Sequence, residues 1–354
     1  MVILTPSAKS LEGSHLSSMC KMTISGRGLS DILEGYRRAM LLMTANQYDF
    51  FTILRTKSMS AEEVALRSKT HPRPTEAVLN ACVGMGLLSK NRSQFTCSEA
   101  ARMYLSKGEQ KYRGNFIKMH QEFYEYWVRL PSLLKLNKPV VKTPSDHYEE
   151  DPAFAARLVK GLNDGARDQA RLVAAELDLP KGPIRLLDLG GGGGAYSIAL
   201  AKRYRNLRAV VFDLPPIIDV TRTIIAQSPL KNRVTVQAGD YFRDKWGSRY
   251  DVVLISKVLR TEGIRTKKMI IRKACKALRK GGVIAIHDTM LDSTKTSPPE
   301  SAIQNISMIL MYPEGGFFSL SELKTWLIGA GFKNPRIHGI QNPERLSLVS
   351  AQKP

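Results

Sequence analysis

The stretch Leu186-Leu-Asp-Leu-Gly-Gly-Gly-Gly-Gly-Ala195 decides the fold class. An apolar run that contains one acid, Asp188, leads directly into five consecutive glycines, and a helical pattern follows from Tyr196 to Tyr204. Glycine weakens regular structure, so five in a row are unfavourable unless the backbone must approach a ligand closely. The order of strand, glycine loop and helix therefore predicts an α/β domain with a ligand site at this loop.

The sequence beyond Lys181-Gly-Pro183 alternates short β-rich runs with helical segments. The expected strands are Ile184–Leu189, Ala209–Phe212, Val234–Gln237, Val252–Ile255, Val283–Ile286 and Leu346–Ala351. Such alternation predicts a Rossmann-like domain, with a mainly parallel sheet and helices on both of its faces.

Acidic residues follow the second and third expected strands. Asp213 lies about twenty residues beyond the glycine loop, where an acid can meet a ribose diol in either an NAD site or an S-adenosylmethionine (SAM) site. Asp240 and Tyr241 add an acid and a ring where an adenine would lie, which a dinucleotide fingerprint does not require. The pair of acids favours SAM, and the alternative is that both acids only cap the helices after their strands.

The N-terminal third is expected to be helical. Residues 1–28 show no periodicity and are expected to be a flexible leader, whereas Ser30 to Leu54 has the spacing of an amphipathic helix. A capping box at Ser60-Ala-Glu-Glu63, a helix from Thr75 to Leu88 and a small hairpin complete a winged helix. Because its second helix is mostly apolar, we expect it to serve packing or dimerisation rather than DNA recognition.

Two longer helices are expected at Tyr112–Lys135 and Asp151–Leu177. The first is rich in aromatic residues, which either form core or wall a substrate pocket. The predicted division of the chain is a leader at 1–28, a winged-helix dimerisation domain at 29–110, a helical linker that contributes to the substrate pocket at 111–180, and the SAM-binding domain at 181–354.

Composition limits the remaining function classes. With 354 residues and 43% hydrophobic content, the chain can bury two cores. The charge of +21, from 53 Lys and Arg against 32 Asp and Glu, is scattered, so we expect a basic surface without a nucleic-acid partner. The cysteines Cys20, Cys82, Cys97 and Cys275 are far apart, so neither a metal site nor a disulfide is predicted. The apolar runs are too short for a membrane span and no signal peptide is predicted, so we expect a cytoplasmic protein.

From about residue 30 onward the chain resembles the SAM-dependent O-methyltransferases of the plant caffeate and acetylserotonin type and their bacterial relatives, including the hydroxyneurosporene and bacteriochlorophyllide C-methyltransferases. Besides the winged helix, the matching stretches are Leu187-Asp-Leu-Gly-Gly-Gly-Gly-Gly, Phe212-Asp-Leu-Pro, Gly239-Asp-Tyr-Phe, Ala277-Leu-Arg-Lys-Gly-Gly and Gly329-Ala-Gly-Phe332. The resemblance implies a homodimer formed through the N-terminal domain, and SAM bound by Asp188, Gly190, Gly192, Asp213, Leu214, Asp240, Tyr241 and Ser256. It implies an acceptor pocket near Asn305, Met308 and Met311, to which we add Tyr124 and Trp127 from the aromatic helix.

The sequence departs from this family at the catalytic base. Relatives that methylate phenols carry a His-Asp pair just after the fourth strand, and the aligned residues here are Arg260 and Thr261. A guanidinium cannot act as a general base near neutral pH. Arg260 is expected to stabilise an anionic acceptor or an enolate, and the alternative is a surface arginine neutralised by Glu262.

Two histidines could replace the missing base. His287 follows the fifth strand, at the sheet edge where ligands of open α/β sheets bind, and His120 lies in the aromatic helix. Each has an ordinary structural alternative. The favoured function is methyl transfer from SAM to an oxygen or carbon of a small aromatic or hydrophobic acceptor; the alternatives are a non-methylating SAM-binding enzyme of the hydroxylase or pericyclase type, or a winged-helix DNA-binding regulator.

Overall fold

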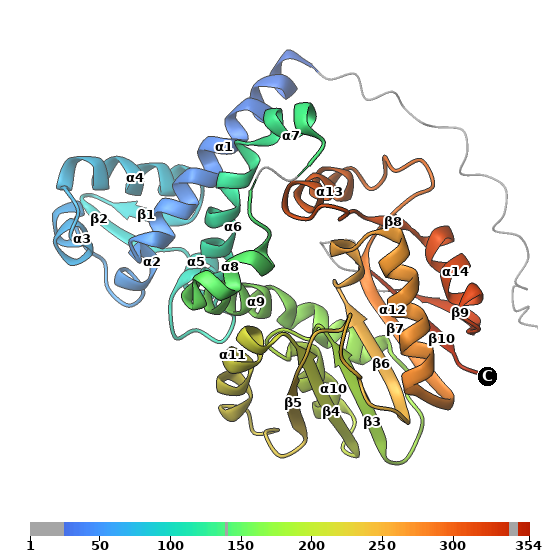
Figure 1. The fold of residues 1–354 in the computed structure, drawn as a ribbon. Helices are drawn as coiled ribbons and strands as arrows, with labels where there is room; N and C mark the ends of the chain where they lie inside the picture. Colours follow the sequence, from blue (N-terminus) through green and yellow to red (C-terminus); the bar gives the residue numbers. More distant parts are fainter. Residues whose placement is uncertain (1–24, 139–140, 340–345) are drawn as a thin grey trace, which may run out of the picture.

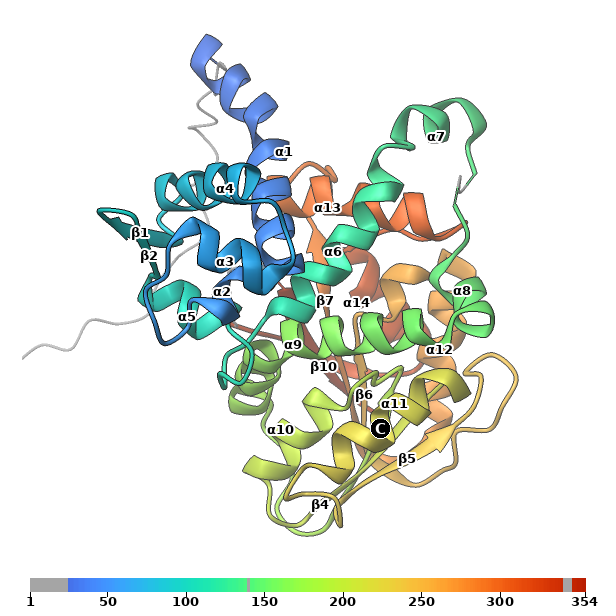
Figure 2. The ribbon, with the colours of Figure 1, turned by 90° about the vertical axis from the view of Figure 1, so that its left-hand side faces the viewer.

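The computed structural model describes residues 25–138, 141–339 and 346–354. A mostly helical N-terminal part leads into a C-terminal α/β part, and the long helix α9 (Pro152–Glu176) runs between them (Figures 1 and 2). The leader expected at 1–28 lies outside the described residues as far as residue 24, and α1 already begins at Gly26.

The N-terminal part has the order of elements expected of a winged helix. It comprises α1 (Gly26–Gln47), α2 (Phe50–Ile53), α3 (Ala61–Ser68), α4 (Pro72–Gly84), the hairpin β1 (Leu88–Asn91) and β2 (Gln94–Cys97), and α5 (Glu99–Leu105). The capping box predicted at Ser60 and Glu63 is present. The single helix expected from Ser30 to Leu54 is wrong, because Asp49 adopts a left-handed φ of 56° that separates α1 from α2.

The middle of the chain forms α6 (Gly114–Trp127), α7 (Leu130–Leu136), α8 (Pro144–Glu150) and α9. The single helix expected at Tyr112–Lys135 is wrong, since the chain turns at Val128 and Arg129 between α6 and α7. Helices α6 and α9 pack closely where α9 carries glycine: a Cβ on Gly161 would lie 2.8 Å from the Cβ of Met119. Because α9 also packs against α10 and α11, this close contact holds α6 next to the α/β part.

The C-terminal part is built on one sheet with strand order β5-β4-β3-β6-β7-β10-β9. Its strands are β3 (Ile184–Leu189), β4 (Leu207–Asp213), β5 (Val234–Ala238), β6 (Tyr250–Ser256), β7 (Leu278–Leu291), β9 (Lys333–His338) and β10 (Leu346–Gln352), and the short β8 (Phe318–Ser319) pairs with the end of β7. The first five are parallel and β10 is antiparallel to both neighbours, which confirms the mainly parallel sheet. All six expected strands are present; β8 and β9 were not foreseen.

Helices cover both faces of this sheet, as expected (Figure 1). Helices α10 (Ala195–Arg203) and α9 pack with α11 (Pro215–Ala226) on one side, and α12 (Ile264–Ala277) packs with α14 (Leu320–Gly329) on the other. Helix α13 (Pro299–Met311) contacts both α6 and β7. None of the helices in the described ranges is long and apolar enough to cross a bilayer.

Candidate active site

The glycine loop follows β3 at the carboxyl edge of the sheet. Gly190, Gly192 and Gly194 have φ of 63°, 51° and 77°, a left-handed conformation that other residues rarely adopt. A Cβ on Gly190 would lie 2.4 Å from Val258, and one on Gly193 would lie 2.6 Å from Asn163 Oδ1, whereas a Cβ on Gly192 would meet nothing within 4 Å. The loop is therefore packed tightly against the protein and open to a ligand at Gly192.

Asp213 ties the end of β4 to this loop. Its Oδ2 accepts a hydrogen bond from the Gly192 amide and its Oδ1 accepts one from the Leu214 amide, both at 2.8 Å. Burial raises the pKa of Asp213 to about 6 despite these two bonds. A partly desolvated carboxylate at this point matches the predicted contact with a ribose diol.

Asp188 is fully buried beneath the loop. Its Oδ2 accepts a hydrogen bond of 2.7 Å from Ser197 Oγ, and burial raises its pKa to about 6. Its Oδ1 has no partner, and neither has Asn163 Oδ1, which faces Gly193. Buried acceptors without donors fit a ligand that brings N–H and O–H groups, as the ammonium and ribose hydroxyls of SAM do.

Asp240 and Tyr241 follow β5 and form a turn of their own. Asp240 Oδ1 accepts a 2.7 Å hydrogen bond from the Phe242 amide, so this acid caps a turn, whereas the alternative interpretation expected it to cap a helix. The Tyr241 hydroxyl donates a 2.6 Å bond to Glu262 Oε1. Burial, together with the neighbouring Glu262 carboxylate, raises the pKa of Tyr241 well above its usual value.

Arg260 is buried in the short 3₁₀ turn Leu259–Thr261 after β6. Its Nε donates a 2.5 Å hydrogen bond to Asp288 Oδ1 and an Nη donates one of 2.9 Å to Thr289 Oγ1. Its guanidinium also lies 4.9 Å from the ring centre of Phe317. The alternative of a surface arginine neutralised by Glu262 is therefore wrong, because the chain supplies a buried counter-ion in Asp288.

The segment 312–317, which follows α13, is held by three polar contacts. The Gly316 amide donates to the Arg260 carbonyl and the Gly316 carbonyl accepts from Lys267 Nζ, both at 2.8 Å. The Phe317 amide donates a 2.6 Å bond to Asn305 Oδ1. Asn305, predicted to line the acceptor pocket, thus positions the segment that carries Phe317.

The predicted acceptor residues Met308 and Met311 share one apolar cluster. Most of the other members come from α6, β7 and the 312–317 segment, and the full set is Tyr126, Phe123, Leu291, Tyr312, Phe317, Val141 and Ala302. Tyr124 and Trp127 are half-buried on α6 but are not members of this cluster. The aromatic helix therefore reaches the acceptor side through its Phe123 and Tyr126 positions.

His287 is fully buried within β7. Its Nδ1 lies 3.1 Å from the Tyr196 hydroxyl and 3.2 Å from Ser256 Oγ, and its Nε2 is buried without a partner. Burial, with Lys257 and Arg260 nearby, lowers its pKa well below the usual value. This environment favours a neutral histidine that links the predicted SAM residue Ser256 to the helix after the glycine loop.

His120 has a different setting. Its side chain is exposed on α6, and its ring packs edge-on against Phe116 with ring centres 4.5 Å apart. No described group of three or more His, Cys, Asp or Glu side chains could hold a metal. A catalytic role for His120 stays a prediction.

Four residues of the site were not foreseen from the sequence: Asn163, Glu262 as the partner of Tyr241, Lys267 and Phe317. Only Lys267 left a usable signal. It lies three, four and seven residues before the buried Ile270, Ile271 and Ala274, so the helical period places it on the inner face of α12. Its ammonium then needs a buried acceptor, which is the Gly316 carbonyl.

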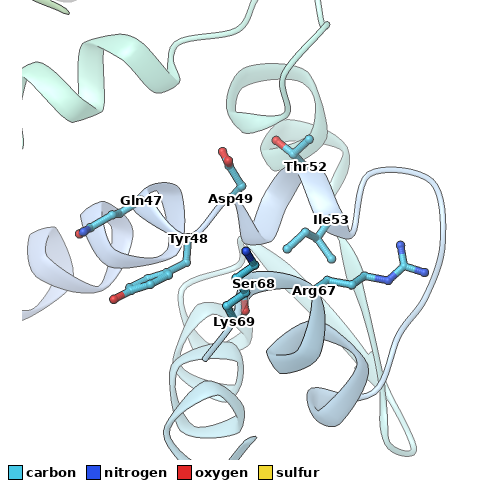
Figure 3. A pocket seen from close by; sticks show the side chains of 8 residues that line it. All are labelled: Gln47, Tyr48, Asp49, Thr52, Ile53, Arg67, Ser68 and Lys69. Carbon is cyan, nitrogen blue, oxygen red and sulfur yellow. The ribbon is translucent and has the colours of Figure 1, made fainter. Parts of the chain in front are cut away.

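A separate hollow of about 400 Å³ lies in the N-terminal part, where α1, α2 and α3 meet (Figure 3). Its lining residues are Gln47, Tyr48, Asp49, Thr52, Ile53, Arg67, Ser68 and Lys69. No predicted site residue lines this hollow.

Comparison with known families agrees with the geometry. Residues 141–333, more than half of the chain, match the O-methyltransferase domain, and residues 30–107 match the O-methyltransferase dimerisation domain. The chain belongs to the O-methyltransferase family. It is a SAM-dependent methyltransferase, and neither the DNA-binding regulator nor the non-methylating enzyme is favoured.

Individual relatives of this methyltransferase match nearly its whole length. It is 28% identical to a 3-hydroxy-5-methyl-1-naphthoate 3-O-methyltransferase from Streptomyces sahachiroi, over 92% of this chain and 94% of that protein. It is 24% identical to an L-tyrosine C(3)-methyltransferase from Streptomyces lavendulae, over 91% of each chain. Its fold matches human N-acetylserotonin methyltransferase, solved with SAM, with a TM-score of 0.83, 19% identity, and coverage of 92% of this chain and 98% of that one.

Proposed function

We propose that this methyltransferase methylates an oxygen or ring carbon of a small aromatic acceptor that is anionic or electron-rich when bound. The observation that carries the proposal is the buried Arg260, held by Asp288 and Thr289 at the position of the usual catalytic histidine. The relatives named above comprise one O-methyltransferase and one C-methyltransferase of aromatic compounds, which supports both acceptor types.

The residues around the glycine loop fit SAM. We assign the loop amides, Gly190 and Gly192 among them, to its amino acid part, with Asp188 beneath them. Asp213 and Leu214 are assigned to the ribose, and Asp240, Tyr241 and Ser256 to the nucleoside side. When bound, SAM supplies a methyl group on a positively charged sulfur, which a nucleophile can displace directly.

Arg260 is proposed to hold the acceptor. Its Nε donates to Asp288 and its Nη2 donates to Thr289, while its Nη1 makes no hydrogen bond with the described residues. That nitrogen can donate to a carboxylate, phenolate or enolate oxygen. Phe317, with its ring against the guanidinium, and the Met308 and Met311 cluster would contact the apolar part of the acceptor.

The absence of histidine at position 260 restricts the acceptor chemistry. A neutral phenol or alcohol loses its proton with difficulty unless a base is present, whereas a carboxylate, an acidic phenol or an activated ring carbon is already nucleophilic. His287 and His120 remain the predicted replacement bases. The burial and depressed pKa of His287 support a positioning role more than a base role.

The assembly and location are also proposals. The matched dimerisation domain supports a homodimer built on the N-terminal part. The dispersed cysteines support a cytoplasmic enzyme, which cell fractionation would check.

The decisive experiment incubates the purified enzyme with SAM and a panel of hydroxyarenes, with and without a ring carboxylate, and follows S-adenosylhomocysteine by mass spectrometry. We expect turnover to be highest with acidic or carboxylated members, and NMR of the product to distinguish a methoxy from a C-methyl group. If neutral phenols are methylated as fast as their carboxylated analogues, the assigned role of Arg260 is wrong. If SAM binds in calorimetry yet no acceptor yields S-adenosylhomocysteine, the proposed acceptor class is wrong.

A further inference from the structure

Helix α12 has an unusual charge distribution. Its sequence Ile264-Arg-Thr-Lys-Lys-Met-Ile-Ile-Arg-Lys-Ala-Cys-Lys-Ala277 carries six cations and no acid. Like-charge neighbours one turn apart disfavour this arrangement, and the helix dipole also disfavours Arg265 and Lys268 near the amino terminus. A feature that weakens its own helix calls for a reason outside the helix.

The six cations divide into two sets. Lys267 and Lys273 turn inward and donate to backbone carbonyls, those of Gly316 and of the 241–244 turn. The other four, Arg265, Lys268, Arg272 and Lys276, are exposed. At 100° and 1.5 Å per residue they project within about 80° of arc and span about 17 Å, so they form one straight row. We call these four residues the α12 row.

The α12 row has no internal counter-charge. None of its members forms an ion pair or side-chain hydrogen bond with the described residues, whereas many other exposed cations, such as Arg222 with Asp219, are paired. Lys276 also borders a hollow of about 330 Å³ that Lys245 lines as well. Lys245 therefore adds positive charge beside Lys276, at the carboxyl end of the row.

We propose that the α12 row is a docking surface for an acidic protein, which it contacts through a helix carrying carboxylates one turn apart. Carboxylates spaced three, seven and eleven residues along a second helix repeat at the same distances as the cations of the row. Ile264 and Met269 flank the row and can contact apolar side chains of the same helix. This proposal does not depend on the identity of the methyl acceptor.

The shape of the row favours an acidic helix over other polyanions. A DNA groove admits a protruding helix, but α12 is packed against the sheet through the fully buried Ile270, Ile271 and Ala274. An anionic membrane is met by a broad basic face, whereas this row is one side chain wide. Helix α12 lies on the outer side of the sheet, away from the N-terminal part, so dimerisation through that part leaves it free (Figure 1).

The docking partner would lie beside the acceptor site. Gly263, which precedes α12, is so close to Glu314 that a Cβ there would meet the Glu314 carboxylate at 2.1 Å. Arg265, the first member of the row, follows two residues after Gly263, the residue that touches Glu314 of the 312–317 segment. An acidic protein on this surface would be placed at the mouth of the acceptor side.

The test measures binding of the full-length enzyme to a fluorescent helical peptide with glutamates in the matching register, by anisotropy at low and physiological salt. A peptide of equal composition and helicity, with its glutamates distributed around the helix, is the comparison. The variant R265E/K268E/R272E/K276E is set against K181E/K202E/K231E/K333E, which reverses four exposed cations elsewhere. Circular dichroism and calorimetry with SAM verify that both variants are folded.

We expect the matched peptide to bind at least about tenfold more tightly than the rearranged one, since only the matched peptide can pair with all four cations of the row at once. Reversal of the α12 row should abolish this preference, and reversal of the control set should leave it. Equal binding of the two peptides, or equal loss in both variants, overturns the proposal. Tighter binding of duplex nucleic acid or of anionic vesicles through the row, compared with the matched peptide, overturns it as well.

Discussion

Arg260 makes two kinds of contact in the site, one through its side chain and one through its backbone. Its guanidinium is buried against Asp288 and Thr289, and its backbone carbonyl anchors Gly316 in the segment beside the acceptor. A change of the Arg260 side chain therefore alters a charge in the site and the contact with the Phe317 ring together, while the backbone carbonyl that anchors Gly316 remains. The two effects can be separated by choosing a replacement that keeps the charge.

We predict that Arg260→Lys lowers kcat about tenfold or more and leaves the SAM dissociation constant within about twofold. Lysine retains the charge but lacks the planar fork that bonds Asp288, Thr289 and a ligand together, and loss of one charged hydrogen bond costs roughly 1.5–3 kcal/mol. Steady-state kinetics and calorimetry measure the two quantities. Arg279→Lys is the control and should retain activity. It alters the ion pair with Asp251, which lies near the start of β6, at the sheet edge opposite the glycine loop.

Arg260→Ala should have a larger effect on stability. It leaves Asp288 buried without its cation, which costs about 3–5 kcal/mol of unfolding free energy. Denaturant unfolding measures this loss. A stable Arg260→Ala variant with normal turnover would show that the buried pair is dispensable and would refute both assigned roles.

Asp188 gives a pH-dependent prediction. Its pKa is about 6 in the folded protein and about 3.9 in an unfolded chain, so the folded state binds its proton more tightly. The contribution of Asp188 to the free energy of unfolding is therefore greatest below pH 4, falls as the pH rises through 6, and is lowest above pH 7. Asp188→Asn removes a charge that is buried at neutral pH.

We predict that Asp188→Asn raises the unfolding free energy of the SAM-free protein by up to about 3 kcal/mol at pH 8, and that the gain shrinks to roughly 1 kcal/mol at pH 4.5. Denaturant titrations at both pH values measure it. Asp219→Asn, on the exposed surface, should show no such trend. An Asp188→Asn protein that is less stable than the original at pH 8 would contradict the raised pKa.

The sequence predicts residue types at this site better than it predicts their partners. The glycine run and the acids at strand ends are local signals, and the structure places Asp188, Gly192 and Asp213 around one loop. The partner of Arg260, Asp288, lies 28 residues away, so tertiary packing and not local spacing brings it to the guanidinium. Glu262, which the alternative interpretation paired with Arg260, accepts a hydrogen bond from Tyr241 instead.

At the scale of elements, strands were easier to predict than helix ends. The strands of the buried parallel sheet are mostly apolar runs, whereas β9 is a mostly exposed and mostly polar strand at the sheet edge and has no such run. The breaks after Gln47 and Trp127 carry no glycine or proline at the turn itself. Helical spacing continues through both, and only packing of the flanking helices reveals them.

The segment 312–317 provides a prediction about one element. Asn305→Ala removes the acceptor of the Phe317 amide and costs about 1–2 kcal/mol of local stability. We expect KM for the acceptor to rise several-fold while SAM affinity is unchanged, as kinetics and calorimetry would show. Asn305→Asp keeps an acceptor oxygen and should restore KM, which separates positioning of Phe317 from direct contact. Unchanged KM in Asn305→Ala would rule out this anchoring role.

At the scale of the whole molecule, α1 presents apolar side chains that the chain itself does not cover. Leu29, Ile32, Leu33 and Tyr36 are each more than half exposed, at the end of α1 that extends away from the sheet (Figure 2). Their spacing of three and four residues places them on one face of the helix. An uncovered apolar row inside a matched dimerisation domain is where the homodimer is proposed to form.

We therefore predict that Leu33→Asp converts a dimer into a monomer at micromolar concentration, since full burial of a leucine contributes about 1.5–3 kcal/mol and a buried unpaired aspartate opposes association. A two-fold dimer contains the change twice, so the effect is doubled. Sedimentation velocity measures the mass directly. Ile328→Asp alters an equally exposed apolar residue on α14 and should remain dimeric. If Leu33→Asp stays dimeric while Ile328→Asp dissociates, the dimer is built on the α/β part. The exposed apolar residues of α1 must then have another partner.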